Sequence, residues 1–201
     1  MPVCLHTAWL VLCVALAGCR SERPATPADV VTQFYTMRDA VGGRGAPSPK
    51  ELAALRPFIT DSLARGLSIA DSLRRADMAR APDEKARFVD GDLFSSLFEG
   101  ATTYRVMPAL ANRPLLVPVE FTNDRLRPVV RWTDTVVVVR IEGRWLVQDL
   151  RYGGSWDFGN KGMLLQQLRA SPWSVTARPL TLHVTRLPVP ASKQQRTHAG
   201  Q

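Results

Sequence analysis

Histidine and cysteine, the residues most often used for acid-base and metal chemistry, are almost absent from the body of this chain. All three cysteines lie within the first nineteen residues, and after His6 the next histidines are His183 and His198. A zinc centre needs clustered Cys or His ligands, so the sequence excludes one, and we expect neither a metal nor a cofactor. The cysteine count also excludes a disulfide framework.

Acidic residues are missing from the last quarter of the chain. From residue 158 onward there is no Asp or Glu, while six basic residues occur, and the whole chain carries a net charge of +8. Basic tails can contact nucleic acid or anionic lipid, or can simply be solvated. The sequence has no basic motif with interleaved aromatic residues, so nucleic acid is not an expected partner. We predict a basic, largely disordered tail over residues 171–201, in which "LTLHV" is the candidate strand.

Long hydrophobic runs are also lacking, since no stretch after residue 20 could span a membrane. The composition is otherwise that of a globular protein, with 45% hydrophobic and 22% charged residues among 201. Such a chain can bury a core of its own. It therefore favours one domain with tails rather than a fibrous or disordered protein.

The first nineteen residues, "MPVCLHTAWLVLCVALAGC", have the pattern of an export signal. An apolar core runs from Ala8 to Ala17 and ends in small residues. The ending "LAGC" resembles the bacterial lipobox, which implies removal of residues 1–18 and lipidation of Cys19. An ordinary signal with a chance cysteine is the alternative. Arg20 follows the cysteine, and by resemblance to the lipoprotein sorting rule it implies an anchor in the outer membrane, facing the periplasm.

Two helix-start signals follow a short polar tether at residues 19–25. In "TPAD" Thr26 is a candidate N-cap before a proline, and in "SPKE" Ser48 repeats the arrangement. The second helical tract extends to about Arg80, with a break expected at Pro57. Its apolar face is predicted to comprise Leu63, Leu67, Ala70 and Leu73, and its solvent side Asp61, Arg65, Arg74, Arg75 and Asp77.

The hydrophobic period then changes to two, which indicates β-strands. Four strands are predicted in "TTYRVMPAL", "LLVPVEFT", "VVRWTDTVVVVRIE" and "RWLVQDLRY", and the last two meet at a Glu142-Gly143 hairpin turn. One more short helix is expected in "KGMLLQQLRA". Helices followed by an antiparallel meander predict a single α+β domain over residues 26–170, with helices packed on a curved sheet of about four strands.

This element order resembles the nuclear transport factor 2-like cone fold, which ketosteroid isomerases, polyketide cyclases and many binding domains share. Two segments, "DGDLFSSLFEG" (90–100) and "DLRYGGSWDFGNKGMLLQQL" (149–168), resemble an uncharacterised family of bacterial lipoproteins and secreted proteins with a domain of this kind. The likeness covers residues 27–170. It implies a fold and an envelope location, but it implies no activity.

Enzymes of the cone fold would use a His-Asp or Tyr-Asp arrangement inside the cone. The predicted domain contains no histidine, so a Tyr-Asp pair would have to combine Tyr104 or Tyr152 with Asp90 or Asp149. The second segment has a glycine-rich loop, which we expect to seat Trp156 and Phe158 against the core. Alternatively, this loop forms the rim of a ligand pocket.

The acidic-aromatic segment, residues 90–100, admits three interpretations. Its acids could ligate calcium or cleave glycosidic bonds, but the alternating oxygen ligands of a calcium loop are missing and nothing indicates a cleft. The spacing of its large apolar residues instead predicts a one-turn helix capped by Asp92, with Ser95 and Ser96 facing outward, that plugs the open end of the cone. The apolar residues concerned are Phe94, Leu97 and Phe98.

From these features we expect a lipid-anchored cell-envelope protein whose domain is a non-enzymatic binding or interaction module. Its partners would be the membrane, through Cys19, and an unidentified protein or small ligand. The candidate ligand-binding residues are Asp90, Asp92, Tyr152 and Trp156. The alternative is a cone-fold enzyme of the isomerase, dehydratase or hydrolase kind that uses Asp and Tyr in an enclosed pocket.

Overall fold

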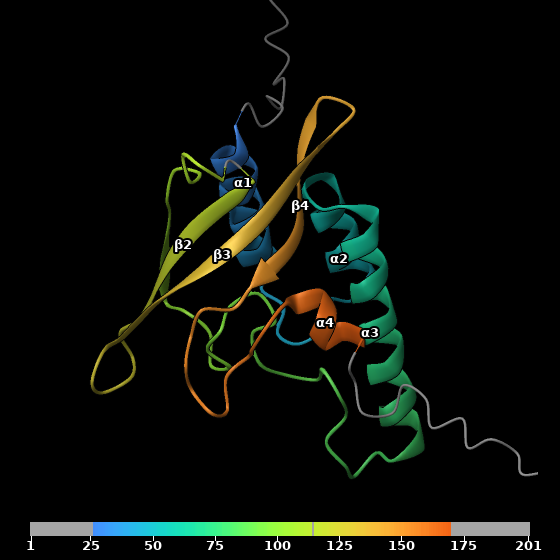
Figure 1. Ribbon diagram of the computed structural model, residues 1–201. Helices are drawn as coiled ribbons and strands as arrows, with labels where there is room; N and C mark the ends of the chain where they lie inside the picture. The colour runs from blue at the N-terminus through green and yellow to red at the C-terminus, as the bar shows by residue number, and fades with distance from the viewer. Residues whose placement is uncertain (1–25, 114, 170–201) are drawn as a thin grey trace, which may run out of the picture.

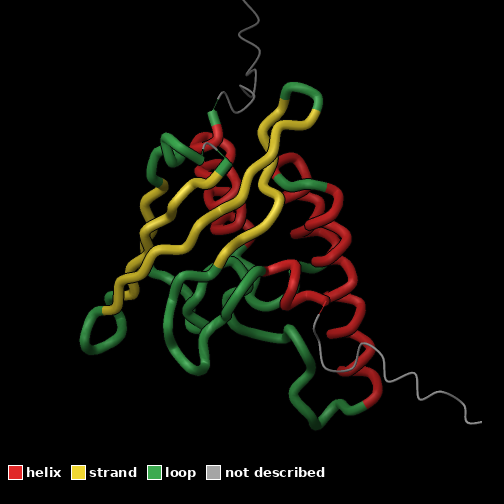
Figure 2. The backbone as a smooth tube through the Cα atoms, in the orientation of Figure 1, coloured by secondary structure: helices red, strands yellow, loops and turns green. Residues whose placement is uncertain are grey.

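The computed structural model describes residues 26–113 and 115–169, which form helices and one four-stranded antiparallel sheet (Figures 1 and 2). The predicted α+β class is confirmed. The predictions for the signal peptide, Cys19, the tether and the tail concern residues outside the described ranges. Within the described ranges, no helix is long and apolar enough to cross a membrane.

The helices begin where local capping chemistry places them. Before α1 (Pro27–Val41), the Thr26 hydroxyl accepts from the Asp29 amide at 3.2 Å, and the Asp29 carboxylate accepts from the Thr26 amide at 2.9 Å. Ser48 caps α2 (Pro49–Leu55) in the same reciprocal way. These caps satisfy amides that have no partner inside the helix, so the chain can start a helix at each site.

The predicted break at Pro57 is also confirmed. A 3-10 turn, η1 (Arg56–Phe58), separates α2 from α3 (Asp61–Arg80), and the Thr60 hydroxyl caps α3. Just before this cap the chain runs alongside the sheet, where the Thr60 amide donates to the Val147 carbonyl at 2.9 Å. This short parallel pairing covers part of an edge strand that would otherwise be open.

The sheet is a meander in chain order. It consists of β1 (Thr103–Val106), β2 (Leu116–Asn123), β3 (Val130–Ile141) and β4 (Arg144–Arg151). The predicted hairpin turn is confirmed, because Glu142 and Gly143 both have positive φ, as a two-residue turn between twisted strands requires. After β4 a long loop leads to the short helix α4 (Leu164–Arg169).

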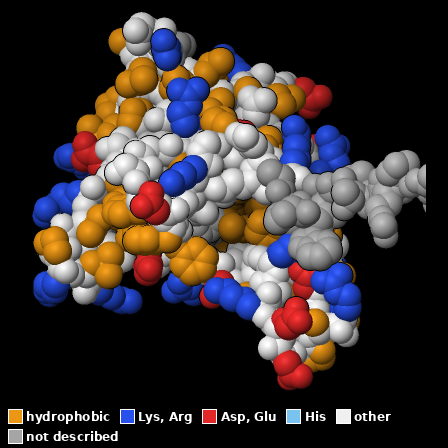
Figure 3. Space-filling view, turned by 60° about the horizontal axis from the view of Figure 1, so that its bottom comes forward, with side chains coloured by type: hydrophobic (Ala, Val, Ile, Leu, Met, Phe, Trp, Pro, Cys, Tyr) orange, Lys and Arg blue, Asp and Glu red, His pale blue; other side chains and the backbone are white. Residues whose placement is uncertain are grey.

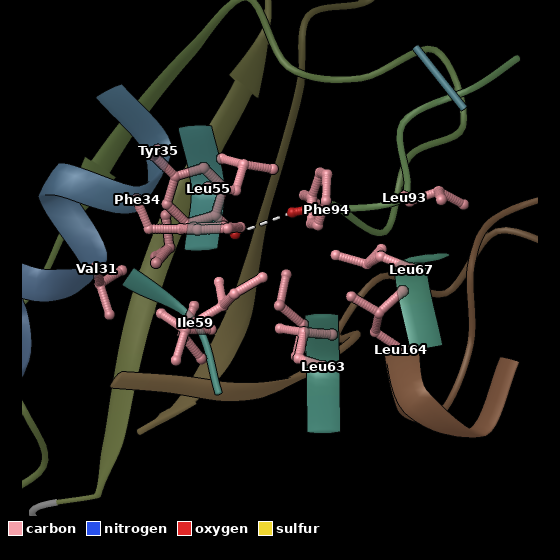
Figure 4. Close-up of a cluster of buried hydrophobic side chains, with 14 of the residues drawn as sticks. Val31, Phe34, Tyr35, Leu55, Ile59, Leu63, Leu67, Leu93, Phe94 and Leu164 are labelled. Atoms are coloured by element: carbon pink, nitrogen blue, oxygen red, sulfur yellow. Dashed lines mark hydrogen bonds between the residues drawn. The ribbon is translucent and has the colours of Figure 1, made fainter. Parts of the chain in front are cut away.

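The helices lie on one side of the sheet. Figure 1 shows α1 behind β2 and β3, and α2 and α3 beside β4, so that the described helices leave the opposite face uncovered. The core between the layers contains a cluster of aromatic rings in edge and stacked contacts, made by Phe34, Tyr35, Phe94, Tyr104, Phe121 and Trp132. Figure 4 shows Phe34 and Tyr35 of α1 directed toward Phe94 of the acidic-aromatic segment.

One prediction for α3 is wrong. Leu63, Leu67 and Ala70 are buried as expected, but Asp77, assigned to the solvent side, is also buried. Its carboxylate accepts from the Arg87 amide at 3.2 Å and from the Arg87 guanidinium at 2.5 and 2.8 Å. The helix period predicts which side of α3 faces the sheet, but it cannot show that the loop after α3 folds back and covers Asp77.

The clamp between Asp77 and Arg87 predicts a specific acid sensitivity. Hydrogen bonds from Arg87 lower the pKa of Asp77 from 3.8 to about 2. A lowered carboxyl pKa stabilises the fold fully above the unfolded-state value and loses this contribution as the pH falls toward the folded-state value. The free energy of unfolding, measured in urea, should therefore fall more steeply between pH 3.8 and about 2 for the parent than for Asp77→Asn. Asp83→Asn, a change at an exposed position, should behave as the parent, and parallel curves for parent and Asp77→Asn would contradict the prediction.

Candidate functional site

The acidic-aromatic segment does not form the predicted one-turn helix. Residues 90–100 make a series of turns, in which the Phe94 amide donates to the Asp92 carboxylate at 2.8 Å and the Asp92 amide donates to the Phe98 carbonyl at 2.9 Å. Leu93, Phe94 and Leu97 are buried, as a plug would require. Ser95 and Ser96, predicted to face outward, are fully buried.

The burial of Ser96 is explained by a carboxylate on the neighbouring strand. Asp134 of β3 accepts from the Ser96 amide at 2.7 Å, from the Ser96 hydroxyl and from the Trp132 indole at 3.1 Å. It also accepts from the Gly153 amide at 2.8 Å. These tertiary bonds pull Ser96 inward, which a helix with outward serines would not permit.

Ser96 extends this network into the glycine-rich loop. Its hydroxyl oxygen accepts from the amides of Gly153 and Gly154 at 3.0 and 2.9 Å. A Cβ on Gly153 would lie 2.0 Å from the Thr133 carbonyl oxygen, so the loop can approach β3 this closely only because the residue is glycine. Asp134 and Ser96 therefore fasten the two sequence segments that stand out in this chain to each other and to the sheet.

Asn160 adds a second connection between these segments. Its side-chain amide donates to the carbonyls of Asp92 and Ser95, both at 2.7 Å, and its backbone amide donates to the Ser96 carbonyl at 2.8 Å. One side chain thus satisfies carbonyls that the irregular segment cannot pair within itself. A loop that is not a helix can be buried here because its polar backbone groups have such partners.

The four predicted ligand-binding residues are not brought together around one cavity. Asp90 is about half exposed and pairs with Lys85 at 3.0 Å, whereas Asp92 is buried and pairs with Arg38 of α1. The Tyr152 hydroxyl is buried and donates to the Leu93 carbonyl at 2.7 Å. Trp156 is half-buried, with its indole edge-on to that of Trp132.

The two tyrosines that contact the acidic-aromatic segment, Tyr35 and Tyr152, act as neutral hydrogen-bond donors. Burial raises the pKa of Tyr152 well above its ordinary value, and the same cause raises that of Tyr35, whose hydroxyl donates to the Phe94 carbonyl at 2.9 Å (Figure 4). Both therefore keep their protons and hold the acidic-aromatic segment in place. The expectation that Phe158 also packs on the core is wrong, because its side chain is 66% exposed.

Two aspartates of the sheet are buried: Asp149, which the sequence analysis named for a Tyr-Asp pair, and Asp134, which it missed. Burial raises the pKa of Asp134, although its hydrogen bonds counteract this effect. Burial also raises the pKa of Asp149, which accepts from the Leu150 and Leu165 amides at 2.8 and 3.0 Å and so fixes the start of α4. A signal for Asp134 was present in "WTDTV", where alternation places it on the same face as Trp132 and Val136.

The hollows among the described residues are open to the surface. A polar cleft of about 340 Å³ includes Arg38, Asp92 and Glu99, and an apolar groove of about 360 Å³ runs between α3 and α4. Larger hollows of about 560 and 600 Å³ lie over the sheet. Asp92 lines the polar cleft, but its carboxylate is already held by Arg38. Within residues 26–113 and 115–169, no group of three or more Asp, Glu, His or Cys side chains could hold a metal ion.

Comparison with known proteins adds little to this geometry. No family model and no curated protein matches the chain. Among solved structures, one match is a crystal structure of a protein of unknown function from Bacteroides thetaiotaomicron VPI-5482. It is 16% identical over 62% of this chain and 84% of that one, with a TM-score of 0.30. So distant a likeness carries no argument about function, and the resemblance to the cone-fold lipoprotein family stays a prediction.

The network around Asp134 predicts a large loss of stability from a nearly isosteric change. In Asp134→Asn an amide NH₂ would face amide or indole donors, which leaves buried donors without acceptors, at a cost of about 2–3 kcal/mol in the free energy of unfolding. Chemical denaturation measures this directly. Asp124→Asn, an exposed change in the β2–β3 loop, should stay within about 0.5 kcal/mol of the parent. Parental stability in Asp134→Asn would show that the network does not hold the loops.

Proposed function

We propose that this protein is a lipid-anchored component of the bacterial cell envelope, whose domain is a non-enzymatic binding module. The first support is the hydrogen bonding of its buried aspartate and tyrosine side chains. Asp92, Asp134 and Tyr152, which an enclosed acid-base site would employ, are buried in hydrogen bonds that close one end of the sheet. These groups serve to fasten loops.

The observation that carries the proposal is an apolar stripe on the uncovered sheet face, beside outward positions that are polar or charged, such as Arg105, Glu120 and Arg131. The strand register places Leu116 opposite Val137, Pro118 opposite Thr135 and Val139 opposite Leu146. These side chains alternate with the fully buried core positions, and all are only partly buried. We call this set the outward stripe: Leu116, Pro118, Val137, Val139, Ile141 and Leu146.

A hollow adjoins the outward stripe and makes part of it concave. It has a volume of about 600 Å³, and its lining includes Val139, Ile141 and Leu146 together with Arg56 and Thr60 from the start of α3 and the turn before it. Apolar surface of this kind, rimmed by polar residues, is typical of sites that bind a partner. On the face shown in Figure 3, hydrophobic side chains gather in patches between the charged side chains, of which more are basic than acidic.

The rival proposal, a cone-fold enzyme, would need a carboxyl group with a raised pKa in a cavity that a substrate can enter. Asp149 and Asp134 both meet the first requirement, because burial raises their pKa values. Asp149 lines none of the four described hollows and accepts from the Leu150 and Leu165 amides. Asp134 is buried more completely. It does not line any of the four described hollows, and its oxygens are occupied by amide, hydroxyl and indole donors. The geometry therefore supports binding at the surface better than catalysis inside.

Substituting the outward stripe tests the binding module. Val137→Lys combined with Val139→Lys places two charges on the uncovered face. Desolvating them against an apolar partner would weaken binding by roughly tenfold or more, because each 1.4 kcal/mol is a factor of ten. The measurement is a crosslinking pull-down from envelope membranes, compared with the thermal unfolding of each variant. Recovery of the same stoichiometric partner by parent and double variant alike would refute the assignment of this face.

A matched control separates a specific surface from a general effect of added charge. Met78 is 48% exposed on α3, away from the sheet. Met78→Lys should leave partner recovery unchanged, and its thermal unfolding should match that of the parent. If the parent captures no partner at all, the binding-module proposal itself loses its support.

The anchor is tested separately at Cys19. Incorporation of a labelled fatty acid into the parent, its loss in Cys19→Ala and a shift of that variant from the membrane to the soluble fraction are the expected results. Equal labelling of parent and variant would show that lipid is attached elsewhere or that the signal is of the ordinary type.

A further inference from the structure

One end of the domain combines the start of the described chain with an exposed hairpin. Figures 1 and 2 show α1 beginning at the same end of the molecule at which the β3–β4 hairpin turns. Contacts agree with this view. The η1 turn touches α1, and the Arg144 guanidinium donates to the carbonyl of Pro57 within η1 at 3.0 Å. The hairpin tip, residues 140–145, therefore lies on the side of the domain from which the N-terminal chain departs.

The hairpin tip carries the side chains of a membrane-surface contact. Ile141 is 46% exposed at the end of β3, and Trp145 is half-buried at the start of β4. The Arg140 guanidinium lies 5.7 Å from the centre of the Trp145 ring, and Arg144 is exposed beside it. Trp residues prefer the boundary between hydrocarbon and water, and Arg side chains can lay their stems on apolar surface while their charge reaches phosphates.

The proposed anchor brings this tip close to lipid. Seven peptide units separate Cys19 from Thr26, and even fully extended they span at most about 25 Å. A domain of this size is roughly 35 Å wide. The tether is shorter than this width, so the opposite end of the domain can reach the bilayer only if the tether runs back along the side of the domain. The end that bears α1 and the hairpin is thus held near the bilayer at a high local concentration.

We propose that the hairpin tip, through Arg140, Ile141, Arg144 and Trp145, docks on the surface of an anionic phospholipid bilayer. This inference rests on the proposed lipid anchor. The tip has two arginines and one acid, Glu142, so its charge complements phosphate groups only modestly. Such a contact binds weakly by itself and acts by orienting a domain that is already tethered.

The experiment supplies the anchor chemically. Protein produced without residues 1–18 is coupled through its single cysteine, Cys19, to maleimide-bearing lipid in phosphatidylcholine vesicles, with or without one part in four of phosphatidylglycerol. Tryptophan emission is then measured with brominated acyl chains, which quench an indole only at short range. Comparison of the parent with Trp145→Phe gives the share of the quenching that depends on Trp145. The matched control is Trp156→Phe, at a half-buried position in the glycine-rich loop.

Brominated lipid should quench the emission of parent and Trp156→Phe equally. Trp145→Phe should lose roughly half or more of this quenching, because Trp145 is the indole at the bilayer surface. Phosphatidylglycerol should increase the quenching of the parent. Ile141→Asp, which retains the indole but adds a charge at the tip, should lose as much as Trp145→Phe. Equal quenching of parent, Trp145→Phe and Ile141→Asp would overturn the proposal, as would quenching that phosphatidylglycerol leaves unchanged. Because the coupling is chemical, this outcome is independent of whether cells lipidate Cys19, which the fatty-acid labelling decides.

Discussion

The architecture of this domain depends on one buried carboxylate. Asp134 of β3 accepts from Ser96, Trp132 and Gly153, and these contacts join segments 38 and 19 residues away in the chain to the middle of the sheet. A buried charge is costly unless its hydrogen bonds are complete, and removing one donor would leave that cost uncompensated. The two long loops are therefore not ordered by regular structure of their own but by their shared dependence on Asp134, with Asn160 satisfying the carbonyls that remain.

Closing the sheet in this way uses up the groups from which an active site could have been built. Tyr35 and Tyr152 both donate to carbonyls of the acidic-aromatic segment, and Asp92 holds Arg38 as well as the Phe94 amide. Their environment explains this role: burial keeps the tyrosines neutral, and a neutral phenol pinned to a carbonyl is a good fastener and a poor base. The groups inside are therefore engaged in the fold, whereas the apolar side chains of the outward stripe lie on the face that the described helices leave uncovered.

How far the sequence predicts this structure depends on the range of the interactions. The caps at Thr26 and Ser48, the break at Pro57 and the hairpin at Glu142-Gly143 are decided by neighbouring residues, and all were predicted. The prediction of a helix within residues 90–100 was wrong, because the spacing of its apolar residues is also compatible with a compact loop. What selects the loop is Asp134, a residue far away in the chain. For the same reason Asp77 was assigned to the solvent, and the sequence could not show that Asp92 pairs with Arg38 or that Tyr152 donates to the Leu93 carbonyl.

The two proposed surfaces impose a geometry on each other. β3 has twelve residues, so at about 3.3 Å per residue it extends roughly 40 Å from the hairpin tip. If the tip rests on a bilayer, the strand leads away from the lipid, and most of the outward stripe stands clear of the membrane and faces sideways. A partner could then approach along the bilayer plane without displacing the domain. Only Ile141 belongs to both surfaces, so a partner that needed the whole stripe would have to compete with lipid for that side chain, whereas one centred on Val137 and Val139 would bind the docked domain unhindered.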